Sequence, residues 1–304
     1  MLPRLLLLGD VCKIRLTKID HCHFLSRFLV FVSGLEIGSA ADDLLSRQLL
    51  ADILTGQLGD EAFQETMSRV VRVVVAGNSL SDRTRDRGAL SRAKYLVKKT
   101  VAGTRDAVVG LDDFLVQLAS GVNVDLMPGE YDPASFTMPQ QQIHRCMLPR
   151  AAALETMRCV TNPYDFEVDG VRILGTSGQS VADVLKFTSG LDNHLAVLEA
   201  TLIAGHLAPT APDTLGCYPF ADRDPFIINV CPHVLFTGNA TDFASKVFRS
   251  DTGASVLLLS IPCFATTKSF VSVNLRTMEC REFLVDAAFA DGSNGVNGDS
   301  MDVS

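Results

Sequence analysis

Runs of apolar residues alternate with amphipathic stretches along the first half of the chain. The run RFLVFVSG (27–34) predicts a buried strand, and apolar residues at helical spacing predict a helix within 41–59 that stops at a glycine. The apolar run at 69–78 predicts a second strand, and VNVDLMPGE (122–130) a third, after a helix over about 88–119. This β, α, β, α, β order predicts an α/β sheet with crossover helices.

The second half of the chain has shorter elements. A hairpin over 165–175 is predicted to turn at Asp169-Gly170. Helices are predicted over 180–187 and 193–205, and strands over 233–239, 255–262 and 270–277. The expected fold is therefore α/β, with two packed mixed β-sheets flanked by helices.

Composition narrows the class of protein. The 304 residues suit one large domain or two small ones, and 47% hydrophobic residues can supply a sizeable core. The net charge of −8 argues against a free-standing DNA-binding module, which usually carries a basic excess. No stretch is apolar and long enough for a membrane span, and the leucine run at 5–8 is too short for a signal peptide.

The cysteines are scattered along the chain without a Cys-x-x-Cys pair. This spacing argues against a zinc ribbon and suggests reduced thiols in a cytosolic or nuclear protein. A metal cluster of Cys12, His21, Cys22 and His23 is the alternative, but its crowded spacing matches no zinc signature.

Glycine turns with polar residues follow the predicted strands, as in MPGEYDP (127–133). In order, VSGLEIGS, VVVAGNSLSD, MPGEYDP, GTSGQSVADVLKF, GHLAPTAPDTLGCYPF, DPFI and PHVLFTGN resemble the B-subunit family of replicative DNA polymerases, and its delta branch in particular. The resemblance runs from about Phe28 to Arg276. It implies a calcineurin-like phosphoesterase sandwich over 28–286. Residues 1–27 do not resemble the family, so its N-terminal oligonucleotide-binding (OB) barrel is expected to be absent, and composition predicts a disordered tail at 287–304.

Active relatives with this fold bind two cations through aspartates and histidines at strand ends, and the resemblance implies that most of these ligands are replaced here. Glu130 and Tyr131 stand in place of an Asn-His pair, and His206 is kept. No catalytic residue, metal ligand or cofactor is therefore expected, although Glu36, Asn78 and Glu130 leave a weak single-cation site as an alternative. The vestigial site comprises Gly34, Glu36, Asn78, Ser81, Glu130, Tyr131, Asp132, His206, Asn239 and Thr241.

Two further segments have open interpretations. A basic run could contact DNA phosphate or an acidic partner, or form a solvated helix face; it contains Arg83, Arg85, Arg87, Arg92, Lys94, Lys98 and Lys99. The stiff segment Pro-Thr-Ala-Pro-Asp (209–213) could be a docking surface or a structural brace.

The resemblance implies a non-catalytic accessory subunit of a nuclear DNA polymerase delta complex in replication and repair synthesis. Such a subunit would bridge the C-terminal metal-binding module of the catalytic subunit and a third, regulatory subunit, and would touch DNA only weakly or indirectly. The alternatives are a metal-dependent phosphoesterase or 3′–5′ exonuclease with a degenerate site, and an independent nucleic-acid-binding module.

Overall fold

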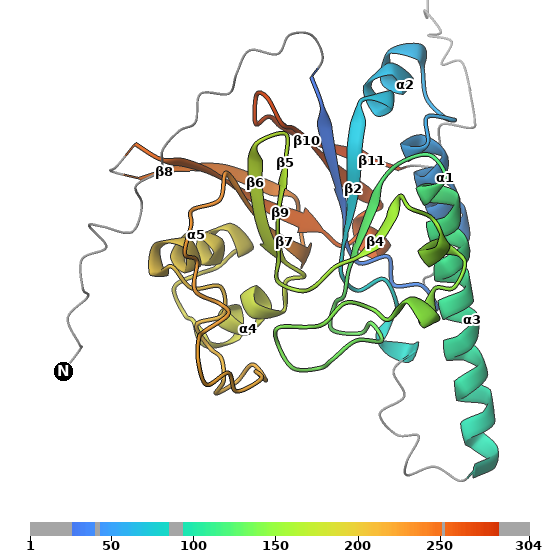
Figure 1. Ribbon diagram of the computed structural model, residues 1–304, viewed down its shortest axis with the longest axis horizontal. Helices are drawn as coiled ribbons and strands as arrows, with labels where there is room; N and C mark the ends of the chain where they lie inside the picture. Colours follow the sequence, from blue (N-terminus) through green and yellow to red (C-terminus); the bar gives the residue numbers. More distant parts are fainter. Residues whose placement is uncertain (1–25, 40–42, 85–93, 251–252, 286–304) are drawn as a thin grey trace, which may run out of the picture.

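Two β-sheets pack face to face, and helices cover their outer faces (Figure 1). The computed structural model describes residues 26–39, 43–84, 94–250 and 253–285. The predicted fold class, mixed α/β with two mixed sheets flanked by helices, is confirmed. The predictions for the atypical segment 1–27 and the tail 287–304 fall almost entirely outside the described residues.

The first sheet contains the predicted β-α-β-α-β unit. β1, β2, β3 and β4 run parallel to one another, while β10 is antiparallel to β1 and β11 is antiparallel to β10. In spatial order, the strands are β11 (Cys280–Leu284), β10 (Ser269–Asn274), β1 (Phe28–Val32), β2 (Val70–Ala76), β3 (Val124–Met127) and β4 (Met157–Cys159).

The second sheet starts with the predicted hairpin, whose turn residues Asp169 and Gly170 both have positive φ angles. β6, β7 and β9 run parallel, and the edge strands β5 and β8 are antiparallel to their neighbours. In spatial order, the strands are β5 (Tyr164–Val168), β6 (Val171–Thr176), β7 (Val234–Ala240), β9 (Ser255–Pro262) and β8 (Ala244–Arg249).

Helices make the crossover connections between parallel strands. α1 and α2 lie between β1 and β2, α3 lies between β2 and β3, and α4 and α5 lie between β6 and β7. Their bounds are α1 (Leu44–Leu54), α2 (Glu61–Ser68), α3 (Lys94–Ala119), α4 (Gln179–Phe187) and α5 (His194–Ala204), with a short α6 (Phe264–Thr267) after β9. Single turns of 3-10 helix occur at η1 (Asp82–Thr84), η2 (Arg145–Met147) and η3 (Ala151–Ala153).

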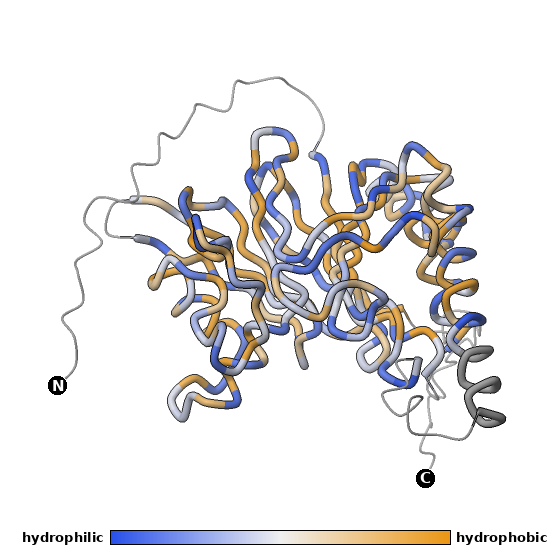
Figure 2. The backbone as a smooth tube through the Cα atoms, turned by 60° about the horizontal axis from the view of Figure 1, so that its bottom comes forward, coloured by the Kyte–Doolittle hydropathy of each residue, from blue (hydrophilic) through white to orange (hydrophobic). Residues whose placement is uncertain are grey.

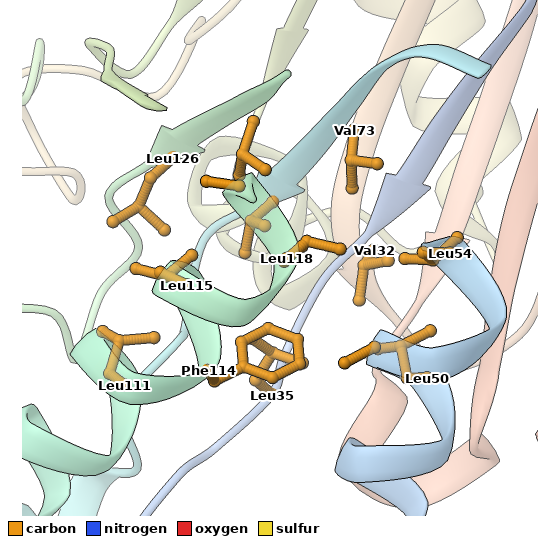
Figure 3. Packing of buried hydrophobic residues seen from close by; sticks show 14 of the residues in the cluster. Val32, Leu35, Leu50, Leu54, Val73, Leu111, Phe114, Leu115, Leu118 and Leu126 are labelled. Carbon is orange, nitrogen blue, oxygen red and sulfur yellow. The ribbon is translucent and has the colours of Figure 1, made fainter. Parts of the chain in front are cut away.

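The core has three layers because successive side chains of a buried strand point to opposite faces of the sheet. In β1, Val30 and Val32 pack against α1 and α3, where Figure 3 shows Val32 beside Leu50 and Leu54. The alternate residues Leu29 and Phe31 pack between the two sheets. A third layer lies between the second sheet and helices α4 and α5. In Figure 2, hydrophobic positions occur both on the extended segments at the centre and along the helices.

Besides the short α6 and the 3-10 turns, one helix and three strands were not predicted from the sequence. α2 (EAFQETMS) is short and fully buries only Met67, with Phe63 partly buried against the core. β8 and β11 are mostly exposed edge strands, and β4 has only three residues. Weak apolar patterning is typical of elements that contribute little to a core. Within the described part of the chain, no helix is long and apolar enough to cross a membrane.

Candidate functional site

The carboxyl ends of the parallel strands from both sheets meet at one place. The side-chain amide of Asn239, in β7, donates to the carbonyl of Ser177, after β6, at 2.7 Å, and to that of Ala76, in β2, at 3.4 Å. Ser33, after β1, donates its hydroxyl to the carbonyl of Pro262 at 2.9 Å and accepts from the Asn239 N–H at 2.9 Å. The strand ends of the two sheets are thus joined by direct hydrogen bonds.

Backbone segments at this junction approach too closely for side chains at two glycines. A Cβ on Gly238 would lie 2.4 Å from the Ala76 carbonyl oxygen, and a Cβ on Gly129 would lie 2.1 Å from the Asn78 nitrogen. Both distances are far below van der Waals contact, so these positions require glycine. The glycines therefore set how closely the strand ends pack.

Left-handed backbone at non-glycine residues also gathers here. Glu36, Asn78 and Asn239 have φ angles of 48°, 51° and 54°. Asparagine tolerates this region, whereas a residue such as glutamate pays on the order of 1 kcal/mol for it. Such outliers cluster at active sites and ligand clamps, and the surrounding structure must hold them in place.

Asp132 holds two of the strand-end turns together. Its fully buried carboxylate accepts hydrogen bonds from the backbone N–H groups of Leu80 and Gly129, both at 2.8 Å, and of Ser79 at 3.2 Å. Burial raises the pKa of Asp132, and these backbone donors oppose that rise. Both oxygens are occupied by backbone donors from the turns after β2 and β3.

A network of neutral side chains completes the junction. The Asn162 amide donates to Gln140 Oε1 at 2.8 Å and to the Ser177 hydroxyl at 2.6 Å. Gln140 in turn donates to the carbonyls of Gly129 at 3.0 Å and Ser135 at 2.9 Å. These groups hold the loop after β3 against the end of β6 without any formal charge.

The structure brings several of the predicted vestigial residues together. Gly34 and Asn239 are close neighbours: a Cβ added to Gly34 would lie 2.8 Å from Asn239 Oδ1. Asn78 Oδ1 accepts a hydrogen bond from the Tyr131 N–H at 3.4 Å. Glu36 accepts a long hydrogen bond from the Cys263 thiol at 3.7 Å, a partner that the sequence did not suggest. Burial, together with the Glu36 charge, raises the pKa of Cys263.

Four other predicted residues have different surroundings. Ser81 is buried beside Gly38, while Glu130 and Thr241 are exposed. His206 donates from Nε2 to Asp224 at 2.9 Å and accepts the Ala208 N–H at Nδ1, at 3.2 Å. Both ring nitrogens of His206 are therefore engaged by groups of its own loop.

The family model for the B subunit of DNA polymerases alpha and epsilon matches residues 29–245. The chain belongs to this family. The predicted resemblance to the B subunits of replicative polymerases is therefore confirmed.

Several curated relatives of this chain are DNA polymerase delta small subunits. The chain is 44% identical over 254 residues to the DNA polymerase delta small subunit of Arabidopsis thaliana, covering 84% of this chain and 57% of the relative. It is 43% identical over 268 residues to DNA polymerase delta subunit 2 of Drosophila melanogaster, covering 86% and 60%. The chain thus spans less than two thirds of the length of these relatives.

A solved structure, TT1561 of Thermus thermophilus, aligns with 86% of this chain and 100% of its own at a TM-score of 0.39 and 11% identity. That likeness is too low to support a conclusion.

The donor groups of the predicted vestigial site do not fit the pair of cations that an active phosphoesterase needs. Asp132 is occupied by backbone N–H groups and His206 by Asp224 and Ala208. Throughout the described residues, no group of three or more His, Cys, Asp or Glu side chains is arranged to hold a metal ion. The hard oxygen ligands and imidazoles that such chemistry requires are not assembled there.

The predicted basic run lies partly outside the described residues. Arg83 is exposed in η1, and Lys94, Lys98 and Lys99 lie in the first turns of α3. Arg85, Arg87 and Arg92 fall in the segment that the structure does not describe.

Sequence reasoning missed the neutral residues that close the junction, Gln140, Asn162 and Ser177. Neutral amides and hydroxyls are common throughout a chain, so no spacing distinguishes these three before the fold is known. Cys263 was counted among the scattered thiols, and only its position after β9 places it beside Glu36.

Proposed function

We propose that this chain acts as a non-catalytic accessory subunit of a DNA polymerase delta complex. The observation that carries the proposal is its 43–44% identity to delta small subunits over 84–86% of its length. The strand-end junction supports the non-catalytic part. Most of its buried groups hydrogen-bond to one another and to the backbone, although Asn239 Oδ1 and the Ser79 and Ser81 hydroxyls have no partner among the described residues. The site therefore holds loops in position and contributes no metal-bound nucleophile.

The proposed mechanism is scaffolding. The two-sheet body presents a preorganised surface to the C-terminal metal-binding module of the catalytic subunit and to a third, regulatory subunit. Because its net charge is −8, the chain would bind DNA only weakly, or indirectly through its partners. Its site of action would be the nucleus. Stable interfaces of this kind are large, and their centres are depleted in charged residues.

Co-expression with a polymerase delta catalytic subunit tests the proposal. The two chains should elute together from a sizing column in about 0.5 M salt, because a mainly apolar interface is insensitive to screening. Asp213→Asn, a substitution at an exposed position, serves as the control variant and should elute together with the catalytic subunit as the wild type does. Failure of the wild-type chain to co-elute at any salt concentration would contradict the proposed partnership.

A nuclease assay tests the non-catalytic part separately. The purified chain, given single-stranded DNA and Mn²⁺, should release no nucleotides above a protein-free control. Release that disappears on chelation would favour the phosphoesterase alternative instead. Because contaminating nucleases also use Mn²⁺, the Glu36→Gln variant, which alters the weak cation site considered from the sequence, should be assayed beside the wild type. Equal release would trace the activity to a contaminant.

A further inference from the structure

A long loop between α5 and β7 surrounds a pocket that lies apart from the strand-end junction. The pocket has a volume of about 460 Å³ and is lined by residues of the segment 206–226. The backbones of residues 205–207 and 226–228 pair at the base of the loop, with the Leu207 N–H donating to Phe226 at 2.9 Å. The loop lies beside α4 in Figure 1.

Two further anchors fix the loop away from its base. Asp183, in α4, accepts hydrogen bonds from the hydroxyls of Thr210 at 2.6 Å and Thr214 at 2.5 Å. On the other side, the Tyr218 N–H donates to the Met138 carbonyl at 2.8 Å, in a short parallel pairing with the loop after β3. The segment 209–213, whose role was open from the sequence, is therefore anchored to the body. An irregular loop with this many anchors is preorganised, which reduces the entropy cost of binding.

The walls of the pocket combine exposed aromatic rings with carboxylates. Tyr218 and Phe220 are 58% and 41% exposed and meet edge to face, with centroids 5.0 Å apart. Asp222 and Asp224 also line the pocket, against the single cation Arg223. The lining therefore has two carboxylates and one guanidinium group.

We propose that this pocket binds a basic peptide segment of a partner protein, with an arginine or lysine side chain placed against Tyr218 and Phe220. Aromatic faces attract cations, and the carboxylates favour the same charge. The aliphatic stem of such a side chain also suits an apolar wall. An acidic segment would meet the excess of carboxylates, which makes it the less favourable occupant. This site goes beyond the scaffolding function, because it specifies the chemistry of one contact.

The test uses a fluorescein-labelled peptide, Ac-Leu-Arg-Leu, and the same peptide with neutral citrulline in place of arginine. Fluorescence anisotropy with the whole chain in about 0.15 M salt should show saturable binding of the arginine peptide. The citrulline peptide should bind at least about threefold more weakly, the loss expected for one exposed cation–π contact with nearby carboxylates. Equal affinities for the two peptides, or no binding of either, would overturn the proposal.

Variants locate the binding on the molecule. Phe220→Ala and Asp222→Asn should each weaken the arginine peptide about threefold or more. Asp213→Asn removes a carboxylate from the same loop outside the pocket, and Phe136→Ala removes an exposed ring elsewhere, so both should bind as the wild type does. Circular dichroism checks that each variant is folded. If Phe220→Ala is unstable, Phe220→Leu is used instead, because it keeps most of the apolar volume but lacks the aromatic face. Binding unaffected by the Phe220 change, or lost equally in the Asp213 control, would refute the pocket.

Discussion

Removing the Asp132 carboxylate should destabilise the fold more than any surface change does. Asp132→Ala leaves three backbone N–H groups, those of Ser79, Leu80 and Gly129, without their acceptor. A buried donor that loses its partner costs about 1–3 kcal/mol, and entry of water reduces the sum. We therefore expect the free energy of unfolding to fall by about 3–5 kcal/mol, a large part of the roughly 5–15 kcal/mol of a typical domain.

Urea unfolding followed by circular dichroism measures this loss, provided that the slope with denaturant stays unchanged. Asp132→Asn keeps one acceptor oxygen but turns an amide N–H₂ toward backbone donors, so its loss should be intermediate. Asp213→Ala, an exposed change, should shift the free energy by less than about 0.5 kcal/mol. If Asp132→Ala costs less than about 1 kcal/mol, the carboxylate does not hold the turns and the reasoning fails.

Three other predictions follow from the described contacts. Arg72→Ala removes the cation that donates to the buried Asp125 carboxylate at 2.6 Å and leaves it only the Tyr164 hydroxyl, at 2.8 Å. The substitution should cost about 3–5 kcal/mol in the same urea assay, and a loss below about 1 kcal/mol would contradict this. Burial raises the pKa of Cys280 to about 11, so at pH 8 iodoacetamide should label the exposed Cys146 well before Cys280. Peptide mass spectrometry measures the two labelling rates, and equal rates would count against this prediction. Burial tends to raise the pKa of Asp224, but hydrogen bonds from the Phe226 N–H and the His206 ring hold this pKa below its usual range. The ionised carboxylate therefore stabilises the fold above about pH 4, and this stabilisation is lost as the pH falls through the folded-state pKa. The stability gap between wild type and Asp224→Asn should thus shrink below pH 4, and a constant gap would refute the coupling.

Much of the fold could be predicted because its central strands are buried on both faces. β1 and β2 read as largely apolar runs, and α1, which follows β1, buries one apolar face. β8 escaped prediction since most of its residues are exposed, and its pairing with β9 rather than an apolar pattern defines it. Edge elements depend on tertiary context, which a local pattern does not contain.

The candidate site was predictable in position but not in its bonding. The glycine turns placed Gly34, Asn78 and Asn239 at strand ends, and parallel strands bring such ends together. The partners of these residues come from distant segments: Asn162 reaches Gln140 across 22 positions, and Asp132 reaches Leu80 across 52. Neither pairing follows from spacing along the chain.

The central claim is that the strand-end junction is held by hydrogen bonds and binds no catalytic metal pair. Crystals of the chain soaked with manganese, measured for anomalous scattering, test it most directly. We predict no anomalous peak within reach of Glu36, Asn78, Asp132 or Asn239. Two strong peaks about 3.5–4 Å apart at this junction, the separation of a two-metal phosphoesterase centre, would contradict the account.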